Sequence, residues 1–448
     1  MLLLHLSDIH FRREEISTPL DPNRHIRNEL LLDAEKMCTL LDKTPSAILI
    51  SGDIAFAAHS DEYAYALTWL EQLAKACGTG IENVFIIPGN HDVARDKSSA
   101  KIVQALHKEI KTTPPSLLDG VMRGLLLDED SSKHLYSSLN EYNSFAVQFF
   151  CDVNAPHRTM TTRDLELNDG SILRLLGFNS ALVSSKFDEP GSLYVDPACF
   201  QVVREKGVEH IVLCHHPFSW LGHGEELQNH LNDISRIQLF GHNHTSRIEL
   251  QDDFIRISAS AAQPNKEEYG WEPGYNLIEI NVNSDGDYRE LDIIAHIRIW
   301  QSSPGQFIAK MRKNDDHYRK KIHLDNWSRP ESKLTDSNIA SIFEKESLQS
   351  ISAAKVSKPV SSWRDPMDKL RIVSVRFYKL TLSQKLTIAR KLGLLEDEDR
   401  DQSNFERFRR VFILAQQRDL IGELDNEIST IIANVTNSNI GRMSRGRL

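Results

Sequence analysis

The sequence predicts an α/β protein with a largely parallel sheet, a β-rich second half and a helical C-terminal part. In the first 90 residues, short apolar runs alternate with helical periodicity, which is typical of parallel strands joined by crossover helices. Beyond about residue 245, apolar and polar residues alternate, which favours antiparallel strands. A chain of 448 residues is longer than one hydrophobic core usually supports, so we expect two domains.

The N-terminal region is predicted to follow the order strand, helix, strand, helix, strand, over residues 2–6, 29–42, 47–51, 61–77 and 84–87. Leu30, Met37 and Leu41 supply the buried face of the first helix, and Tyr63 and Leu70 contribute to that of the second. Gly78 is expected to end the second helix.

Residues 93–163 lose the strand pattern and are predicted to form a helical insertion. Helices are expected over 101–111 and 134–150, with a break at Pro114-Pro115. Insertions at the carboxyl ends of strands commonly build substrate pockets, so this cap is a candidate determinant of selectivity. The alternative is a helical bulge that only packs on the core.

The strand pattern returns after the insertion. Strands are predicted over 172–178, 211–214 and 237–240, with a helix over 197–206, and antiparallel strands over 248–250, 255–257, 277–280 and 293–299. Asp285-Gly286-Asp287 is predicted to form a hairpin turn.

The C-terminal third changes in character. From about 310 to 360 the chain is first basic and then rich in Ser and Lys, with little periodicity, which indicates a polar linker. Helices are predicted after Trp363, over 370–378, 381–392, 404–416 and 420–432. We therefore expect a main domain at 1–300, a β-extension and linker at 301–362, and a helical domain at 363–448. The runs 380–394 and 405–424 resemble the small adaptor domains of bacterial conflict systems.

Composition and charge limit the class of protein. A net charge of -10 and a pI near 6.0 argue against a broad, sequence-independent grip on nucleic acid, although a local basic groove is compatible with them. The five cysteines form no C-x-x-C pair, which indicates neither a disulfide framework nor a thiolate zinc site. The N-terminal apolar run is too short for a signal peptide and no stretch has the length of a membrane span, so we expect a cytoplasmic protein without membrane contact.

Five apolar runs end abruptly in residues of the types that bind metal ions. The run at 84–87 leads into Gly89-Asn90-His91-Asp92, a polar turn that suits a ligand site at the carboxyl end of a strand. For this motif alone, an ordinary strand-to-helix turn is the alternative. The other runs end in Ser7-Asp8-Ile9-His10, Ser51-Gly52-Asp53, His215-His216-Pro217 and Gly241-His242-Asn243-His244.

These motifs, in this order, resemble the calcineurin-like metallophosphoesterase superfamily, whose pattern is D-x-H, G-D, G-N-H-[DE], a lone His and G-H-x-H. Every element is present without substitution, and the resemblance spans residues 1 to about 295. It implies a four-layer α/β/β/α sandwich and two divalent metal ions, with manganese as the expected metal and iron or zinc as alternatives. The implied ligands are Asp8, His10 and His244 for one ion, Asn90, His215 and His242 for the other, and Asp53 for both.

The residue types agree with hydrolysis of a phosphoester. Two ions about 3.5–4 Å apart act as Lewis acids and make a hydroxide available at neutral pH, and carboxylate, amide and imidazole ligands without thiolate suit such ions. The resemblance implies in-line attack by a hydroxide that bridges the ions. His91 is then left to protonate the leaving group or to stabilise the transition state. Asp92 is expected to orient the His91 ring, with capping of the next helix as the alternative.

Other residues near the motifs keep two interpretations. The pattern His-x-Pro selects His215 rather than His216 as the metal ligand. His223 lies between two glycines and could reach a substrate, or it is a loop histidine without a role. Arg12 and Arg13 could contact a phosphate or lie on a solvated surface.

The leading hypothesis is a phosphodiesterase that acts on a nucleotide or nucleic acid, with a phosphomonoesterase as the alternative. Residues 52–58 lack the G-D-x-x-D-R-G motif of protein serine/threonine phosphatases, and Asp92 stands where those enzymes have Glu. Compact members with G-N-H-D resemble cyclic-nucleotide phosphodiesterases, and larger members with an added domain resemble DNA-repair nucleases. A hypothesis of another class is an interaction protein whose C-terminal helices recruit a partner. The complete ligand set argues against a degenerate core.

Overall fold

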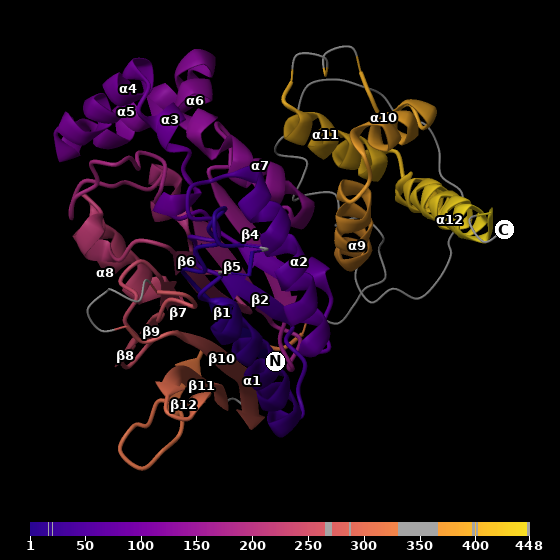
Figure 1. The fold of residues 1–448 in the computed structure, drawn as a ribbon. Coiled ribbons are helices and arrows are strands. Elements are labelled where there is room, and N and C mark those ends of the chain that lie inside the picture. Colours follow the sequence, from indigo (N-terminus) through magenta and orange to yellow (C-terminus); the bar gives the residue numbers. More distant parts are fainter. Residues whose placement is uncertain are drawn as a thin grey trace.

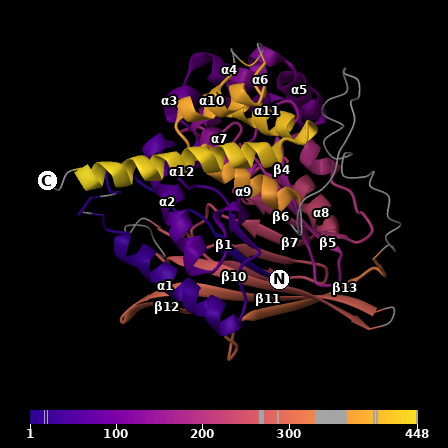
Figure 2. The same ribbon diagram turned by 90° about the vertical axis from the view of Figure 1, so that its right-hand side faces the viewer.

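In the computed structural model, the main domain contains two mixed β-sheets packed face to face, with helices outside them (Figure 1, Figure 2). The structure describes residues 1–445 except 17, 20, 265–270, 286–287, 330–365, 397–398 and 400–401. The first sheet has the strand order β12-β11-β10-β1-β2-β3, with β13 also paired to β11, and the second has the order β4-β5-β6-β7-β9-β8. The predicted α/β sandwich is confirmed.

The first sheet joins the start of the chain to residues 274–324. The parallel strands β1 (Leu2–Leu6), β2 (Ala47–Ile50) and β3 (Val84–Ile86) continue antiparallel into β10 (Gly274–Asp285), β11 (Tyr288–Ser302), β12 (Gly305–Ala309) and β13 (Tyr318–Leu324). Asp285 pairs with Tyr288, which confirms the hairpin, although its turn residues 286–287 lie outside the described part. β13 occupies a stretch that we expected to be linker, because its basic side chains hid the strand pattern.

The second sheet follows the helical insertion. It contains β4 (Met160–Glu166), β5 (Ile172–Phe178), β6 (Val208–Cys214), β7 (Ser235–Phe240), β8 (Arg247–Leu250) and β9 (Ile255–Ser258). The prediction of purely antiparallel pairing after residue 245 was wrong for β9, which pairs parallel with β7 and antiparallel with β8. After β7 the chain first forms β8 at the edge of the sheet. It then turns back, and β9 lies between β8 and β7.

Helices cover the outer faces of the two sheets (Figure 1). α1 (Arg24–Leu41) and α2 (Ser60–Ala76) lie on one side, and α8 (Gly224–Ile234) lies on the other. The inner faces share one hydrophobic core, and they approach so closely that a Cβ on Gly177 of β5 would lie 2.5 Å from Ile87 Cγ2. The helix predicted over 197–206 is only a short 3₁₀-helix, Pro197–Gln201.

The insertion contains α3 (Arg95–Ser98), α4 (Lys101–Thr112), α5 (Pro115–Leu127), α6 (Glu129–Tyr136) and α7 (Asn140–Ala146). α5 was not predicted, because Pro115 was interpreted as a break. It instead occupies the first turn of α5, where proline's missing N–H costs nothing. The helix predicted over 134–150 is interrupted by the 3₁₀-helix Ser137–Leu139.

The C-terminal helices are α9 (Pro366–Tyr378), α10 (Leu382–Lys391), α11 (Asn404–Gln417) and α12 (Ile421–Arg445). They bury a hydrophobic core of their own and also pack on the main domain (Figure 1). Phe150 lies against this second core, with its ring centroid 6.0 Å from that of Phe412. Arg409 Nη1 lies 2.7 Å from Asp152 Oδ1, and Lys379 Nζ lies 2.5 Å from Glu71 Oε1.

Two further expectations concern the chain as a whole. The predicted linker at 330–362 and the start of the helical domain at Trp363 lie outside the described residues. Within the described ranges, no helix has the length and apolar character needed to cross a bilayer. All five cysteines are buried and none of them is in a disulfide.

Candidate metal centre

The polar residues that follow β1, β2, β3, β6 and β7 meet at the carboxyl ends of the two sheets. Backbone hydrogen bonds join the loops that carry them: Asp8 N donates to Gly52 O at 3.1 Å, and Gly241 N donates to His215 O at 3.0 Å. Five motifs that lie far apart in the sequence therefore form one site. This is the edge at which α/β sheets bind their ligands.

The first set of donor atoms comes from the loops after β1 and β7. His244 Nε2 lies 3.2 Å from Asp8 Oδ1, and His10 Nε2 lies 3.9 Å from the same oxygen. These three groups lie within 4.8 Å of one another, which is close enough to share one ion. His10 Nε2 is also 3.1 Å from Asp53 Oδ2, so the first set extends to the loop after β2.

The second set of donor atoms surrounds the amide oxygen of Asn90. His215 Nε2 lies 3.0 Å, His242 Nδ1 3.1 Å and His216 Nε2 3.2 Å from Asn90 Oδ1. His215 Nε2 is also 3.3 Å from Asp53 Oδ2. The Asp53 carboxylate therefore contacts a histidine of each set, which is the geometry expected of a bridging ligand.

When His215 is neutral, hydrogen bonding does not account for the second set. His215 Nδ1 lies 2.8 Å from Ser51 O, so in the neutral ring Nδ1 carries the proton and donates it to that carbonyl. Nε2 then directs a lone pair at Asn90 Oδ1 and Asp53 Oδ2, which are themselves acceptors. A proton or a cation among these atoms removes the repulsion. The chemistry of the donor set therefore fits a divalent cation.

The charges of the site also favour cations. Burial alone would raise the pKa of Asp53, but His215, His91 and a hydrogen bond from His10 hold it well below its ordinary value. Burial would lower the pKa of His215, yet Asp53 and Asp8 outweigh this and raise it to about 9. Ionised carboxylates thus lie in a buried site where positive charge is strongly attracted.

Much of the site's backbone is held in the left-handed region, which non-glycine residues rarely adopt. Asp8 and His10 both have φ of 51°, Asp53 has 55°, His242 has 68° and His244 has 55°. Left-handed residues cluster at functional sites, where surrounding structure maintains the strain. These five angles are thus an independent indication that the conformation serves a ligand.

Comparison with known proteins identifies the main domain. Residues 1–246, more than half of the chain, match the family model described as calcineurin-like phosphoesterase. The chain belongs to this family. Residues 369–430 match a second model, described as GTPase-associated adaptor domain, which confirms the predicted resemblance of the C-terminal helices.

Individual relatives are distant. The uncharacterized metallophosphoesterase-like protein YydB of Bacillus subtilis (strain 168) is 24% identical over 298 residues, which are 63% of this chain and 57% of YydB. Wild-type Vps29 from Entamoeba histolytica, complexed with Zn²⁺, is similar over 72% of this chain and 99% of its own, with 10% identity and a TM-score of 0.28. A putative 5'-nucleotidase from Staphylococcus aureus is similar over 62% of this chain and 51% of its own, with 14% identity and a TM-score of 0.32.

In this calcineurin-like phosphoesterase domain, His91 lies beside the first donor set. Its ring centroid is 4.6 Å from that of His10, and its Nδ1 is 2.7 Å from Phe56 O. The Phe56 ring stacks on the His91 ring with centroids 4.9 Å apart. Since Nδ1 is paired with a backbone carbonyl and one ring face is covered, the orientation of the His91 ring is fixed, and Nε2 remains for a reacting group.

The Asp92 carboxylate contacts backbone donors and a tyrosine. Its carboxylate accepts hydrogen bonds from Gly89 N at 3.0 Å, Ala55 N at 3.1 Å and the Tyr63 hydroxyl at 2.9 Å. Burial, together with nearby Asp53, raises the pKa of Asp92 to about 6 in spite of these bonds. Asp92 therefore ties the loop after β3 to the loop after β2, and it caps its own 3₁₀-helix, Asn90–Asp92, rather than the next helix. Its orientation of the His91 ring stays a prediction.

His216 is a site residue that the sequence pattern did not reveal. The structure brings both histidines of the pair to Asn90, and His216 Nδ1 also lies 2.9 Å from Ser180 Oγ. Burial, with His215 and His242 nearby, lowers the pKa of His216 well below its ordinary value, so the ring is neutral. The doubled histidine in the sequence was the signal for it, and the choice of His215 as the metal ligand stays a prediction.

The two arginines after His10 separate in the structure. Arg12 Cζ lies 3.9 Å above the Phe56 ring, which places its guanidinium at the rim of the metal centre. Arg13 pairs with Asp61 at 3.2 Å on an exposed surface. Arg12 Nε also lies 4.0 Å from Glu15 Oε1, and contact of Arg12 with a phosphate stays a prediction. Arg13 lies on a solvated surface, as in the alternative.

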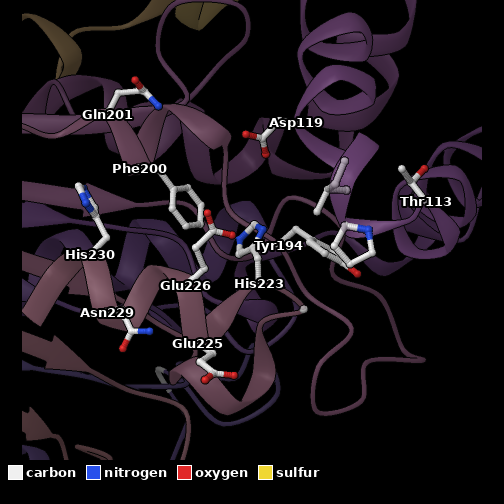
Figure 3. A pocket seen from close by; sticks show the side chains of 13 residues that line it. Thr113, Asp119, Tyr194, Phe200, Gln201, His223, Glu225, Glu226, Asn229 and His230 are labelled. Atoms are coloured by element: carbon white, nitrogen blue, oxygen red, sulfur yellow. The ribbon is translucent and has the colours of Figure 1, made fainter.

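A separate hollow of about 620 Å³ lies between the insertion and α8 (Figure 3). His223 and Tyr194 form part of its wall, and its lining includes the carboxylates of Asp119, Glu225 and Glu226 but, within the described chain, neither Lys nor Arg. The lining contains none of the proposed metal ligands. The insertion thus helps to form a cavity, but one whose charge disfavours phosphate, and His223 belongs to it rather than to the metal centre.

Proposed function

We propose that this protein hydrolyses phosphodiesters of nucleotides or nucleic acid, using two divalent metal ions. The proposed ligands are Asp8, His10 and His244 for one ion, Asn90, His215 and His242 for the other, and Asp53 for both. The observation that carries the proposal is the position of Asp53 Oδ2, 3.1 Å from His10 Nε2 and 3.3 Å from His215 Nε2. When bound, the ions would polarise the phosphoryl oxygens and activate water at neutral pH. Manganese is the proposed metal, with iron or zinc as alternatives.

The chain's own residues would position the substrate and move the proton. Asp53 Oδ1 accepts a hydrogen bond from His91 N at 2.7 Å, so the residue that contacts both donor sets also places His91. His91 would donate a proton from Nε2 to the leaving oxygen, because its Nδ1 is engaged by Phe56 O. Asp92 would hold the loop after β2 and the loop after β3 in a fixed relative position.

A diester is preferred over a monoester on two grounds. The G-N-H-D motif departs from that of protein phosphatases. In addition, half-buried aromatic rings lie beside both donor sets, Phe56 next to His91 and Trp220 next to His242, and such rings suit a substrate with an organic group on each side of phosphorus.

The test is a hydrolysis screen with metal-loaded protein. Cyclic nucleotides, single- and double-stranded nucleic acid and bis(p-nitrophenyl) phosphate represent diesters, and p-nitrophenyl phosphate represents monoesters. Higher kcat/KM on a diester supports the proposal. A preference for the monoester would replace it with the alternative, and absence of hydrolysis on all substrates would refute both.

We also infer that the helices α9–α12 bind a protein partner, because residues 369–430 match a domain described as a GTPase-associated adaptor. A GTPase from the same organism is the partner to test. Co-elution of the purified pair in size-exclusion chromatography supports this inference. The control is a chain truncated after Arg329, which lacks these helices and should elute alone.

A further inference from the structure

Trp220 is an aromatic side chain at the metal centre to which neither the family pattern nor the proposed ligand set gives a role. It ends a 3₁₀-helix, Phe218–Trp220, that follows the two histidines after β6. Its ring centroid lies 4.2 Å from that of His242 and 6.0 Å from that of His216. The side chain is only partly buried, so some of its surface faces solvent beside the second donor set.

The backbone holds Trp220 firmly in this position. Trp220 N donates to Pro217 O at 2.9 Å, and Trp220 O accepts a hydrogen bond from Leu193 N at 3.0 Å. Phe218, at the start of the same 3₁₀-helix, is buried, with its ring centroid 4.9 Å from that of Phe240. A partly buried tryptophan on such a rigid base can receive a ligand with little loss of conformational entropy.

The indole nitrogen of Trp220 is not needed by the fold. Among the described residues, Trp220 Nε1 has no hydrogen-bond partner, and because the side chain is only partly buried this N–H can donate to a ligand. The ring therefore offers a partly accessible aromatic surface and one donor to a ligand. A planar nucleobase uses both features, and stacking on tryptophan accepts any base.

A positive charge lies near the first donor set, on the side of the site away from Trp220. There the Arg12 guanidinium lies over the Phe56 ring, which in turn stacks on His91. A cation at one rim and a partly open aromatic ring at the other match a substrate that has a base beside one ester oxygen and negative charge beside the other. A nucleoside phosphodiester has this chemistry.

We propose that Trp220 is the platform on which the nucleobase next to the scissile phosphate stacks. This inference rests on the proposed phosphodiesterase function and specifies its substrate class as nucleoside-bearing diesters, recognised by stacking rather than by base-specific hydrogen bonds. Trp220 is thus a residue that determines specificity, outside the set that holds the metals.

The experiment compares two diesters with the same leaving group, thymidine 5'-(p-nitrophenyl phosphate) and methyl p-nitrophenyl phosphate. Wild-type protein should show a higher kcat/KM for the thymidine ester. Trp220→Ala should reduce the thymidine-to-methyl ratio of kcat/KM by roughly 10- to 100-fold, the range for loss of one stacked base. Trp220→Phe should restore most of the ratio. Trp300→Ala changes a tryptophan of β11 that packs on Phe307, and it should leave the ratio unaltered.

Three outcomes would overturn the inference. If Trp220→Ala lowers both esters equally, the ring only supports His242. If wild-type protein hydrolyses both esters equally well, there is no base site, although the proposed phosphodiesterase function stands. If it hydrolyses neither ester, the proposed function fails together with the base site. Should Trp220→Ala not fold, the ratio in Trp220→Phe and Trp220→Leu decides, since only the phenyl ring can stack.

Discussion

Replacement of Asp53 by Asn removes the one carboxylate that contacts both donor sets. Its Oδ2 lies 3.1 Å from His10 Nε2 and 3.3 Å from His215 Nε2, so an ion held by either set would lie within about 4 Å of it. At an effective dielectric constant of about 20, one unit of charge at 4 Å contributes about 4 kcal/mol. That energy corresponds to roughly 10³-fold in affinity, and both ions are affected.

The side chain of asparagine has the same shape as that of aspartate and keeps an oxygen to accept the His91 N–H, so the fold should persist. We expect Asp53→Asn to lose bound metal on dialysis, measured by elemental analysis, and to lose turnover at metal concentrations that saturate the wild type. The matched control is Asp61→Asn, which removes a surface carboxylate paired with Arg13. Two tightly bound ions and a normal rate in Asp53→Asn would refute the bridging assignment.

Three other perturbations test separate parts of the account. His91→Ala should retain its metal, and its kcat should fall by roughly 10²- to 10⁴-fold. The loss should be smaller for p-nitrophenyl esters than for esters of poor leaving groups. Loss of metal would show instead that His91 is a ligand. His107 is buried, both of its ring nitrogens lack partners among the described residues, and burial lowers its pKa from 6.5 to about 4. The imidazole of His107 therefore binds a proton more tightly in the unfolded chain than in the folded one. As pH falls from 6.5 to 4, this difference should lower the free energy of unfolding by roughly 3 kcal/mol. Urea unfolding of His107→Leu should show a weaker pH dependence there, and an unchanged dependence would contradict this. A chain truncated after Arg329 keeps β13 and keeps Trp327, whose ring contacts Arg289. It should fold, bind two metal ions and hydrolyse bis(p-nitrophenyl) phosphate near the full rate. Insolubility or lost activity would show that contacts between the C-terminal helices and the main domain, such as Arg409–Asp152, are essential.

The sequence was sufficient for the strands that carry the site, since each combines a short apolar run with an abrupt polar end. The run before Asn90 and the run before His215 are examples: both are buried strands, and both deliver their polar residues to the same edge. The order of the five motifs along the chain and their residue types were enough to predict which side chains meet at one site. Periodicity likewise located the C-terminal helices, where Thr381 caps α10 through its hydrogen bond with Gln384.

Features that depend on tertiary contacts could not be predicted. Asp92 has the residue type of a partner for His91, but its carboxylate accepts hydrogen bonds from its own loop, from the loop after β2 and from Tyr63 of α2. His216 is excluded by the motif yet reaches Asn90, because Ser180 holds its ring from a neighbouring strand end. β13 was hidden by its basic residues: Arg319 and Lys321 lie on the exposed side of a strand at the sheet's edge, and Lys320 interrupts the apolar side.

The most direct test of the two-ion account is a titration of metal-free protein with Mn²⁺, in which bound metal and hydrolysis of bis(p-nitrophenyl) phosphate are measured in the same samples. The account predicts two ions bound per chain and full activity only when both are present, because Asp53 joins the two donor sets. Full activity with one ion or none, or two bound ions without hydrolysis of any phosphoester, would contradict it.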